Sequence, residues 1–441
     1  MKVLLLNVPF AEGYHKASID LPPLGIGYIA SVLRRQGHQV GVLDLNLHSW
    51  EQLTSLDDID IVGISSDTPR HPGALSIGRF FRSRNIPVIM GGPHASFRAE
   101  SSLRSGAADY VVRGEAEYIV ADLLRGIKES GQGADVPGVS AIQNGGMVHN
   151  PPNQAIPDVG SLPYPARDLL PMSRYQARVG NRKATSIIGS RGCPFNCSFC
   201  ASSQLFGLRW RAREAEDIVD EMEHLQREFG IQAVLFMDDN FTLNHRRTIR
   251  ICEEMLRRNL DMHWWCFSRV NTIVEHEDMV QAMAEAGAKQ VFLGVESPNE
   301  EVLEDYNKGI TADTAVRAVD LLSKHSLETY ASFIIGDVFE TKDMVRKTIR
   351  FANSLRPGLA QFAILTPYPG TQLYEQYKDR ILQDKDWSYY DGLHAVLRPE
   401  HLKPEELERF LKKAFLSFYL KPRKISLWGR VGKLLWYFLK N

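Results

Sequence analysis

Residues 190–203 read SRGCPFNCSFCASS and place Cys193, Cys197 and Cys200 in one short stretch at the spacing C-x3-C-x2-C. Three thiolates can hold three irons of a cubane [4Fe–4S] cluster and leave the fourth iron without a protein ligand. That open iron can bind a small molecule and pass an electron to it. The stretch therefore predicts a catalytic metal site in which these cysteines are the ligands.

A structural zinc site and ordinary buried cysteines are the alternatives. Structural zinc takes four ligands, and no histidine or further cysteine stands at partner spacing from this stretch. The chain's other cysteines, Cys252 and Cys266, fall in helix and strand patterns. Five cysteines with three clustered do not suit a secreted disulfide framework, so we expect one cluster and a reducing compartment.

The cysteine stretch follows the first of a series of β-rich segments that alternate with helical ones, which favours parallel strands with helical crossovers. Six such units are too few for a closed eight-stranded barrel, so an open, partial (β/α)6 barrel is expected over residues 179–380. Its site should lie at the carboxyl ends of the strands. The predicted strands are Ser186 to Gly189, Ala233 to Met237, His263 to Phe267, Gln290 to Val295, Tyr330 to Ile335 and Gln361 to Leu365.

With these positions in view, the segment resembles the radical S-adenosylmethionine superfamily. FMDDNFT (236–242) ends the second strand and GVESP (294–298) ends the fourth, while TPYPGTQLY (366–374) completes the pattern. The resemblance implies a [4Fe–4S] cluster that cleaves S-adenosylmethionine to a 5′-deoxyadenosyl radical. It assigns cosubstrate contacts to Asp238 and Asp239 near the methionyl amino group, and to Glu296 with Ser297 at the ribose.

Each of these residues also has a plain structural interpretation. Asp238 and Asp239 can cap the following helix, and Glu296 can be an ordinary surface carboxylate. IIGDVFET (334–341) departs from the Gly-Pro-Gly turn usual in relatives, which leaves the adenine contacts unassigned. Arg269, Tyr330 and Tyr368 are the substrate-facing candidates.

Residues 1–135 show a second alternation of strands and helices, with strands at Val3 to Asn7, Val40 to Asp44, Ile59 to Ile64, Pro87 to Met90 and Tyr110 to Val112. Apolar runs such as IVGIS and VIMGG suit a parallel sheet covered on both faces. The prediction is an α/β, doubly wound, Rossmann-like domain. It has no G-x-G-x-x-G after its first strand and no P-loop, so a nucleotide is not the expected ligand.

Its motifs NVPF, PPLGIGYIASVLRRQG (22–37), GISS (63–66), GGPHAS (91–96) and RGEAE (113–117) resemble the cobalamin-binding domain that precedes many radical S-adenosylmethionine barrels. Small residues at the strand ends would let a flat corrin approach closely, although Gly-Gly-Pro can equally make a simple turn. The D-x-H-x-x-G motif that supplies a histidine to cobalt in some cobalamin proteins is absent. The predicted cobalamin contacts are Gly63, Ser65, Ser66, Gly91, Gly92 and His94.

Two further regions complete the expected organisation. Residues 136–178, rich in proline, glycine and asparagine, are expected to be a linker. Residues 381–441 are expected to be a helical C-terminal region with a helix from Pro404 to Tyr419. The basic and apolar tail 424–441 suits an interfacial helix at a membrane and an ordinary packed helix equally well.

The composition bounds the class of protein. A hydrophobic content of 44% and a net charge of −1 favour a globular protein and disfavour binding to nucleic acid through bulk charge. MKVLLLNVPF reads as a buried first strand, and no apolar stretch is long enough to span a bilayer, so we expect a cytoplasmic protein, with peripheral contact at the inner membrane face as an option.

The leading functional hypothesis joins both resemblances: a radical enzyme with cobalamin as second cofactor that methylates an unactivated carbon of a hydrophobic or natural-product substrate. A radical cyclase or rearrangement enzyme on a tetrapyrrole or lipid precursor is the nearest alternative. A catalytically inert, cobalamin-responsive binding protein is the alternative of another class. Methylthiotransferases are disfavoured, because residues 1–192 contain no cysteine. The expected partners are a small-molecule or lipid substrate and an electron donor such as flavodoxin or ferredoxin.

Overall fold

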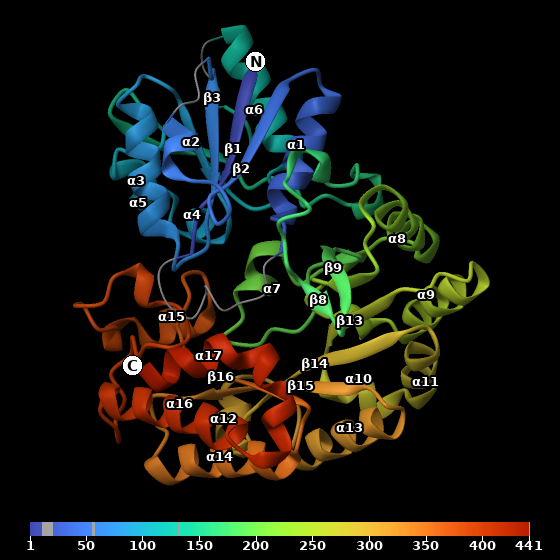
Figure 1. The fold of residues 1–441 in the computed structure, drawn as a ribbon. Coiled ribbons are helices and arrows are strands. Elements are labelled where there is room, and N and C mark those ends of the chain that lie inside the picture. The colour runs from blue at the N-terminus through green and yellow to red at the C-terminus, as the bar shows by residue number, and fades with distance from the viewer. Residues whose placement is uncertain (11–20, 55–57, 131–132, 134, 441) are drawn as a thin grey trace. The chain divides into compact units, whose positions relative to one another are not determined.

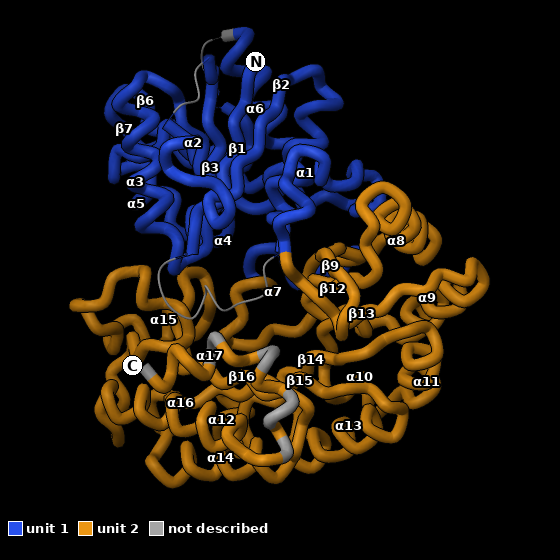
Figure 2. The backbone as a smooth tube through the Cα atoms, in the orientation of Figure 1, with its two compact units in different colours: residues 1–11, 20–175, 204–211 blue, residues 12–19, 176–203, 212–441 orange. Residues whose placement is uncertain are grey.

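The computed structural model describes residues 1–10, 21–54, 58–130, 133 and 135–440. Figure 2 shows that the chain divides into two compact units. The first consists of the described residues of 1–11, 20–175 and 204–211, and the second of those of 176–203 and 212–441. The short return of residues 204–211 to the first unit includes Arg211, which forms a buried ion pair of 2.7 Å with Glu115.

The first unit is built on a seven-stranded sheet in the order β2-β1-β3-β4-β5-β6-β7. Strands β1 to β5 are parallel, as their buried apolar runs predicted. Helices lie on both sides of this sheet (Figure 1), which confirms the doubly wound architecture. The bounds are β1 (Lys2–Asn7), α1 (Leu24–Arg35), β2 (Gln39–Asp44), α2 (Trp50–Thr54), β3 (Ile61–Ser65), α3 (His71–Arg82), β4 (Val88–Gly91), α4 (Pro93–Phe97), α5 (Ala99–Arg104), β5 (Tyr110–Val112) and α6 (Glu117–Ser130).

The first part of residues 136–178 forms regular structure where the sequence predicts a linker. β6 (Val139–Gln143) and β7 (Gly146–His149) form a hairpin that adds two antiparallel strands to the sheet beside β5. The hairpin turns at Asn144 and Gly145, both with positive φ, 49° and 78°. Asn-Gly between two strands is a strong signal for this turn type, so the local sequence supports the hairpin.

The second unit is built on another seven-stranded sheet, in the order β16-β15-β14-β13-β12-β9-β8. All neighbouring pairs from β9 to β16 are parallel, and only β8 is antiparallel to its neighbour. Strands β9 and β16 do not pair, so the predicted open half-barrel with six parallel strands is confirmed. The strands of this sheet are β8 (Arg178–Val179), β9 (Arg182–Ile187), β12 (Ala233–Phe236), β13 (His263–Ser268), β14 (Ala288–Glu296), β15 (Glu328–Ile335) and β16 (Leu359–Ile364). The short strands β10 (Ser190–Arg191) and β11 (Arg211–Ala212) form a separate two-stranded sheet.

Helices follow the strands and cover the sheet's outer side, where a continuous apolar core forms. Trp264 and Phe333 are among its largest fully buried side chains. This rigid layer holds the carboxyl ends of the strands in place. The helix bounds are α7 (Ala201–Phe206), α8 (Ala215–Phe229), α9 (His245–Arg257), α10 (Val270–Glu275), α11 (Glu277–Glu285), α12 (Glu300–Asp305), α13 (Ala312–Lys324), α14 (Lys342–Leu355), α15 (Gln372–Tyr377), α16 (Pro404–Tyr419) and α17 (Trp428–Lys440).

The C-terminal helices pack on this core. The ring of Phe438 in α17 stacks on Phe415 of α16 with centroids 4.5 Å apart. Lys424 points inward, and its Nζ donates to the carbonyl oxygens of Pro357 and Gly358 at 2.6 and 2.7 Å. In the part of the chain that the structure describes, every helix is too short or too polar to cross a bilayer.

Candidate functional site

The cysteine stretch lies between β10 and α7, just beyond the carboxyl end of β9. Cys197 is buried, whereas Cys193 and Cys200 are partly exposed. The backbone around Ser198 anchors the stretch, because its N–H donates to the carbonyl of Tyr306 and its own carbonyl accepts from Leu373. The three thiols are thus held on one loop, where they would serve as three separate ligands.

The environment of these thiols disfavours free thiolates. Burial raises the pKa of Cys193 and of Cys200, and the nearby carboxylate of Asp239 raises both further. A thiol of this kind loses its proton when it binds a metal. Among the described residues, no three His, Cys, Asp or Glu side chains converge as on a single metal ion. Each ligand of a cubane binds a different iron, so a cluster does not need that convergence.

Asp238 and Asp239 follow β12 and have different surroundings. Asp238 is almost fully buried, and its two oxygens accept from the backbone N–H of Gly189 at 2.7 Å and from the Ser190 hydroxyl at 2.5 Å. Asp239 accepts from the Ser202 hydroxyl, just after the third cysteine. Asp238 therefore orders the loop between β9 and β10, and Asp239 is the carboxylate beside the thiols.

Glu296, the last residue of β14, is held by a buried ion pair. Lys308 Nζ lies 2.6 Å from Glu296 Oε1, and both side chains are less than one tenth exposed. The backbone of Glu296 has φ of 62°, in the left-handed region, beside a register shift in the β14–β15 pairing. Non-glycine residues adopt this conformation at a cost and often at functional sites. The strand end thus turns this carboxylate out of the regular pleat.

Gly294 makes room for that pair. A Cβ at this position would lie 2.4 Å from Glu296 Oε1 and 2.6 Å from Lys308 Nζ. Ser297, predicted as a cosubstrate contact, uses its hydroxyl otherwise: it accepts from the backbone N–H of Asn299 at 3.1 Å and faces Thr348 of α14. The structure therefore brings Glu296 and Lys308 together, while Ser297 orders the turn that follows.

Two buried donors stand near neighbouring strand ends: Arg269, which the sequence named as a substrate-facing candidate, and Asn240, which it missed. Asn240 Nδ2, after β12, and Arg269 Nε, after β13, are buried and have no hydrogen-bond partner among the described residues. Arg269 Nη1 lies 3.6 Å from Cys197 Sγ. Unpaired buried donors are costly, so this set fits a bound group that carries acceptor atoms. Their places directly after predicted strands were the available signal.

IIGDVFET (334–341), the segment without the Gly-Pro-Gly turn, begins at the end of β15 and contains a buried acidic cluster. Glu340 accepts from the backbone N–H groups of Gly336 and Asp337, and Asp337 accepts from the Tyr377 hydroxyl at 2.9 Å. Burial raises the pKa of Asp337 to about 6 and that of Glu340 to about 7. Of the other candidates, Tyr330 packs its ring against Phe292 with centroids 5.0 Å apart.

In the first unit, the strand order 2-1-3 puts a topological switch point between β1 and β3, where such sheets bind ligands at the carboxyl ends. Ser65 and Ser66 lie at the end of β3 there. Gly92 has φ of 93°, and a Cβ on it would lie 2.5 Å from the carbonyl oxygen of Ser66. Gly63 makes room for Leu5, and Gly91 pairs through its carbonyl with the N–H of Ser66. Ser65 and Gly91 thus stand at the carboxyl ends of β3 and β4, whereas Gly63 lies two residues before the end of β3.

His94 is buried beside the same edge of the sheet. Its ring packs against His71 with centroids 4.0 Å apart and the planes tilted by 31°, and Nδ1 lies 3.2 Å from the Thr68 hydroxyl. Burial, together with His71 and Arg98, lowers the pKa of His94 to about 2, so the ring is neutral. Its role as a contact for cobalamin stays a prediction.

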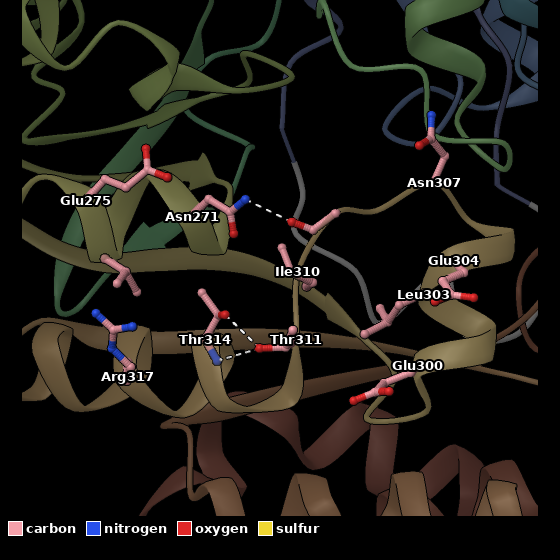
Figure 3. Close-up of a pocket in the computed structure, with 12 residues that line it drawn as sticks. Asn271, Glu275, Glu300, Leu303, Glu304, Asn307, Ile310, Thr311, Thr314 and Arg317 are labelled. Atoms are coloured by element: carbon pink, nitrogen blue, oxygen red, sulfur yellow. Dashed lines mark hydrogen bonds between the residues drawn. The ribbon is translucent and has the colours of Figure 1, made fainter.

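A separate pocket of about 1000 Å³ lies among α10, α12 and α13 (Figure 3). Asn271 bridges it by donating to the carbonyl of Gly309 at 2.9 Å. Its lining includes Glu275, Glu300 and Glu304 with Arg317. No predicted site residue lines it, so the candidate site stays at the strand ends.

Comparison with known proteins agrees with this geometry. Residues 187–352 match the model of the radical SAM superfamily, and residues 14–124 match that of the B12 binding domain. An uncharacterised methyltransferase of Pyrococcus horikoshii is 37% identical over 434 residues, 96% of this chain and 93% of that protein. The anaerobic magnesium-protoporphyrin IX monomethyl ester cyclase of Rubrivivax gelatinosus is 28% identical over 95% of this chain and 79% of that one.

Among solved structures, the cobalamin-dependent S-adenosylmethionine radical enzyme OxsB has the same fold, with a TM-score of 0.80 at 19% identity over 100% of this chain and 72% of that one. The two matched domains imply a [4Fe–4S] cluster, S-adenosylmethionine and cobalamin as cofactors, and the thiols, acceptors and unpaired donors at the strand ends of the second unit fit the first two. The chain belongs to the radical S-adenosylmethionine superfamily, in the class that carries a cobalamin-binding domain ahead of the radical domain.

Proposed function

We propose that this protein methylates an unactivated carbon atom of a hydrophobic or natural-product substrate. The observation that carries the proposal is the loop with Cys193, Cys197 and Cys200 at the strand ends, in a chain that shares 37% identity over nearly its full length with a protein named as a methyltransferase. When bound, the cluster and S-adenosylmethionine supply one-electron cleavage to a carbon radical, and cobalamin supplies a methyl group.

The chain's own residues would bind and orient the cluster and the cosubstrate. The three cysteines would hold the cluster as thiolates, with Cys197 the most deeply buried of them. Asp239 and Glu296 are the carboxylates available to the cosubstrate's ammonium and hydroxyl groups, and the ion pair with Lys308 orients Glu296. Asn240 and Arg269 offer donors to a carboxylate. The burial of these groups excludes water, which strengthens each of these interactions.

In the first unit, we propose that Gly63, Ser65, Ser66, Gly91 and Gly92 receive the corrin. In support, Ser65 ends β3 beside the switch point and Gly91 ends the neighbouring β4. An external electron donor such as flavodoxin or ferredoxin is proposed for the reduction. The domains proposed for these roles are residues 1–135 and 179–380.

The test is anaerobic reconstitution of the protein with iron, sulfide, cobalamin and S-adenosylmethionine bearing a deuterated methyl group, followed by assay of 5′-deoxyadenosine and of label in candidate substrates. Cys197→Ala should abolish 5′-deoxyadenosine formation. Cys252→Ala makes the same substitution at a core cysteine outside the site, and this variant should still form 5′-deoxyadenosine. Deoxyadenosine in wild type without transfer of the label would overturn methylation.

The second candidate function is a radical cyclisation or rearrangement on a tetrapyrrole or lipid precursor. The observation in its favour is the similarity to the Rubrivivax gelatinosus cyclase over 95% of this chain and 79% of that one. Product formation without incorporation of the labelled methyl group distinguishes it. An inert cobalamin-responsive protein, the alternative of another class, predicts cobalamin binding with no deoxyadenosine at all.

We also propose that α17 gives the protein peripheral membrane contact at the inner face. Trp436 and Leu439 are more than half exposed on this helix, 62% and 61%, whereas Leu435 and Phe438 are buried. Trp436→Ser with Leu439→Ser should then lower binding to vesicles of anionic phospholipid, and unchanged binding would remove the proposal.

A further inference from the structure

Arg269 occupies an unusual electrostatic position beside the cysteine loop. It follows β13 directly and forms the N-cap of α10, and its side chain is 9% exposed. Within the described residues, no carboxylate forms an ion pair with it. A buried cation without a counter-charge is strongly disfavoured, so its environment should contain negative charge when the protein is loaded.

Three contacts fix the guanidinium in one place. Nη2 donates to the carbonyl oxygen of Lys308, and the group lies over the ring of Phe195 at 3.8 Å from its centroid. Nη1 is directed at Cys197 Sγ, 3.6 Å away. Phe195 belongs to the same loop as the cysteines, so the loop itself clamps the arginine.

Among these three contacts of Arg269, the sulfur of Cys197 is the partner that can carry a negative charge. As a cluster ligand, Cys197 carries a thiolate that accepts hydrogen bonds and donates none. A planar, always-charged guanidinium is a strong donor to such an acceptor. Hydrogen bonds to ligand sulfurs and nearby charge set the reduction potential of an iron–sulfur cluster, because they stabilise the more negative, reduced state.

We propose that Arg269 is a positioning residue that donates a charge-assisted hydrogen bond to Cys197 Sγ and raises the reduction potential of the cluster. This rests on the proposed cluster site. The arginine thereby makes the cluster easier for an electron donor to reduce, and the ligated sulfur supplies part of the charge that compensates the guanidinium. Lys308 links the two features of the site, since its carbonyl holds Arg269 and its ammonium holds Glu296.

The first experiment is an EPR-monitored redox titration of the full-length reconstituted protein without S-adenosylmethionine. Arg269→Gln should destabilise the reduced cluster at least tenfold relative to the oxidised one, a shift of about 59 mV to more negative potential for one electron. Arg250→Gln removes the same charge from an exposed site on α9, where it pairs with Glu216, and should leave the potential unchanged. An unchanged potential in Arg269→Gln, with full iron content, overturns the proposal.

A second measurement uses the unmutated site. Protein labelled with ¹⁵N in its arginine side chains should show a nitrogen hyperfine coupling to the reduced cluster by pulsed EPR, and Arg269→Lys should remove it. Absence of the coupling in the wild-type protein overturns the proposal even if Arg269→Gln fails to assemble a cluster. A wild-type protein that binds no cluster contradicts the proposed function itself, whereas a normal cluster insensitive to Arg269 contradicts this inference alone.

Discussion

Lys308 and Glu296 form a buried ion pair, 2.6 Å between Nζ and Oε1, at the carboxyl end of β14. The pair lies over Gly294, and the same lysine's carbonyl receives Arg269. One residue twelve positions beyond the predicted carboxylate thus joins two parts of the site.

Lys308→Met should leave the Glu296 carboxylate buried without its partner. Breaking a buried pair from one side costs about 3–5 kcal/mol, so the urea midpoint should fall markedly. The double variant Lys308→Met with Glu296→Gln removes both charges and should recover part of that loss. A double variant no more stable than Lys308→Met would show that the loss does not come from an unpaired carboxylate charge.

Gly294→Ala should displace the ion pair, because the added Cβ would lie 2.4 Å from Oε1 of Glu296. We expect weaker binding of S-adenosylmethionine, measured by calorimetry on the reconstituted protein, together with a lower melting temperature. Gly432→Ala in α17 is the matched control, since a Cβ there meets no atom within 4 Å. That control should be neutral or stabilising by up to about 1 kcal/mol through helix propensity.

Stability should decrease as pH rises through the range of the buried acids. The folded protein raises the pKa of Asp337 from 3.8 to about 6 and that of Glu340 from 4.5 to about 7, so it binds these protons more tightly than the unfolded chain. The free energy of unfolding therefore falls between about pH 4 and pH 7, by about 3 kcal/mol for Glu340, and levels off above. Urea unfolding at pH 5 and pH 8 measures this.

Glu340→Gln is the variant that isolates that effect. An amide oxygen can still accept from the N–H groups of Gly336 and Asp337, but the residue no longer titrates. The difference in stability between pH 5 and pH 8 should shrink by the share of Glu340. If the variant keeps the wild-type pH dependence of stability, groups other than Glu340 cause that dependence.

Phe438→Ala should destabilise the second unit by about 3–5 kcal/mol, because the ring is buried and stacked on Phe415. Trp436→Ser, at a largely exposed position of the same helix, should change stability little. Thermal unfolding of both variants compares them directly. Similar losses in both would mean that Trp436 also packs against the protein.

Much of the fold was predictable from the sequence because buried parallel strands are short continuous apolar runs. AVLF at 233–236 and LAQFAI at 359–364 are strands in the positions that their composition indicated. β9 begins at Arg182, before the predicted segment, since its first residues Arg182 and Lys183 are charged and hide the strand from a hydrophobicity pattern. The β6–β7 hairpin was overlooked in a segment whose prolines and glycines suggested a linker.

For the site, the sequence by itself determined the identity of the three thiols and the strand ends at which carboxylates should stand, because ligand spacing and strand order are local properties of the chain. Only the tertiary structure decided that Asp238 bonds to Gly189 and Ser190, that Glu296 is held by Lys308, and that Arg269 is directed at Cys197. Most of these partners lie on different strands or the loops after them, up to 72 positions apart, and Lys308 lies in the loop after α12. They meet because parallel strands bring their carboxyl ends to one edge of the sheet.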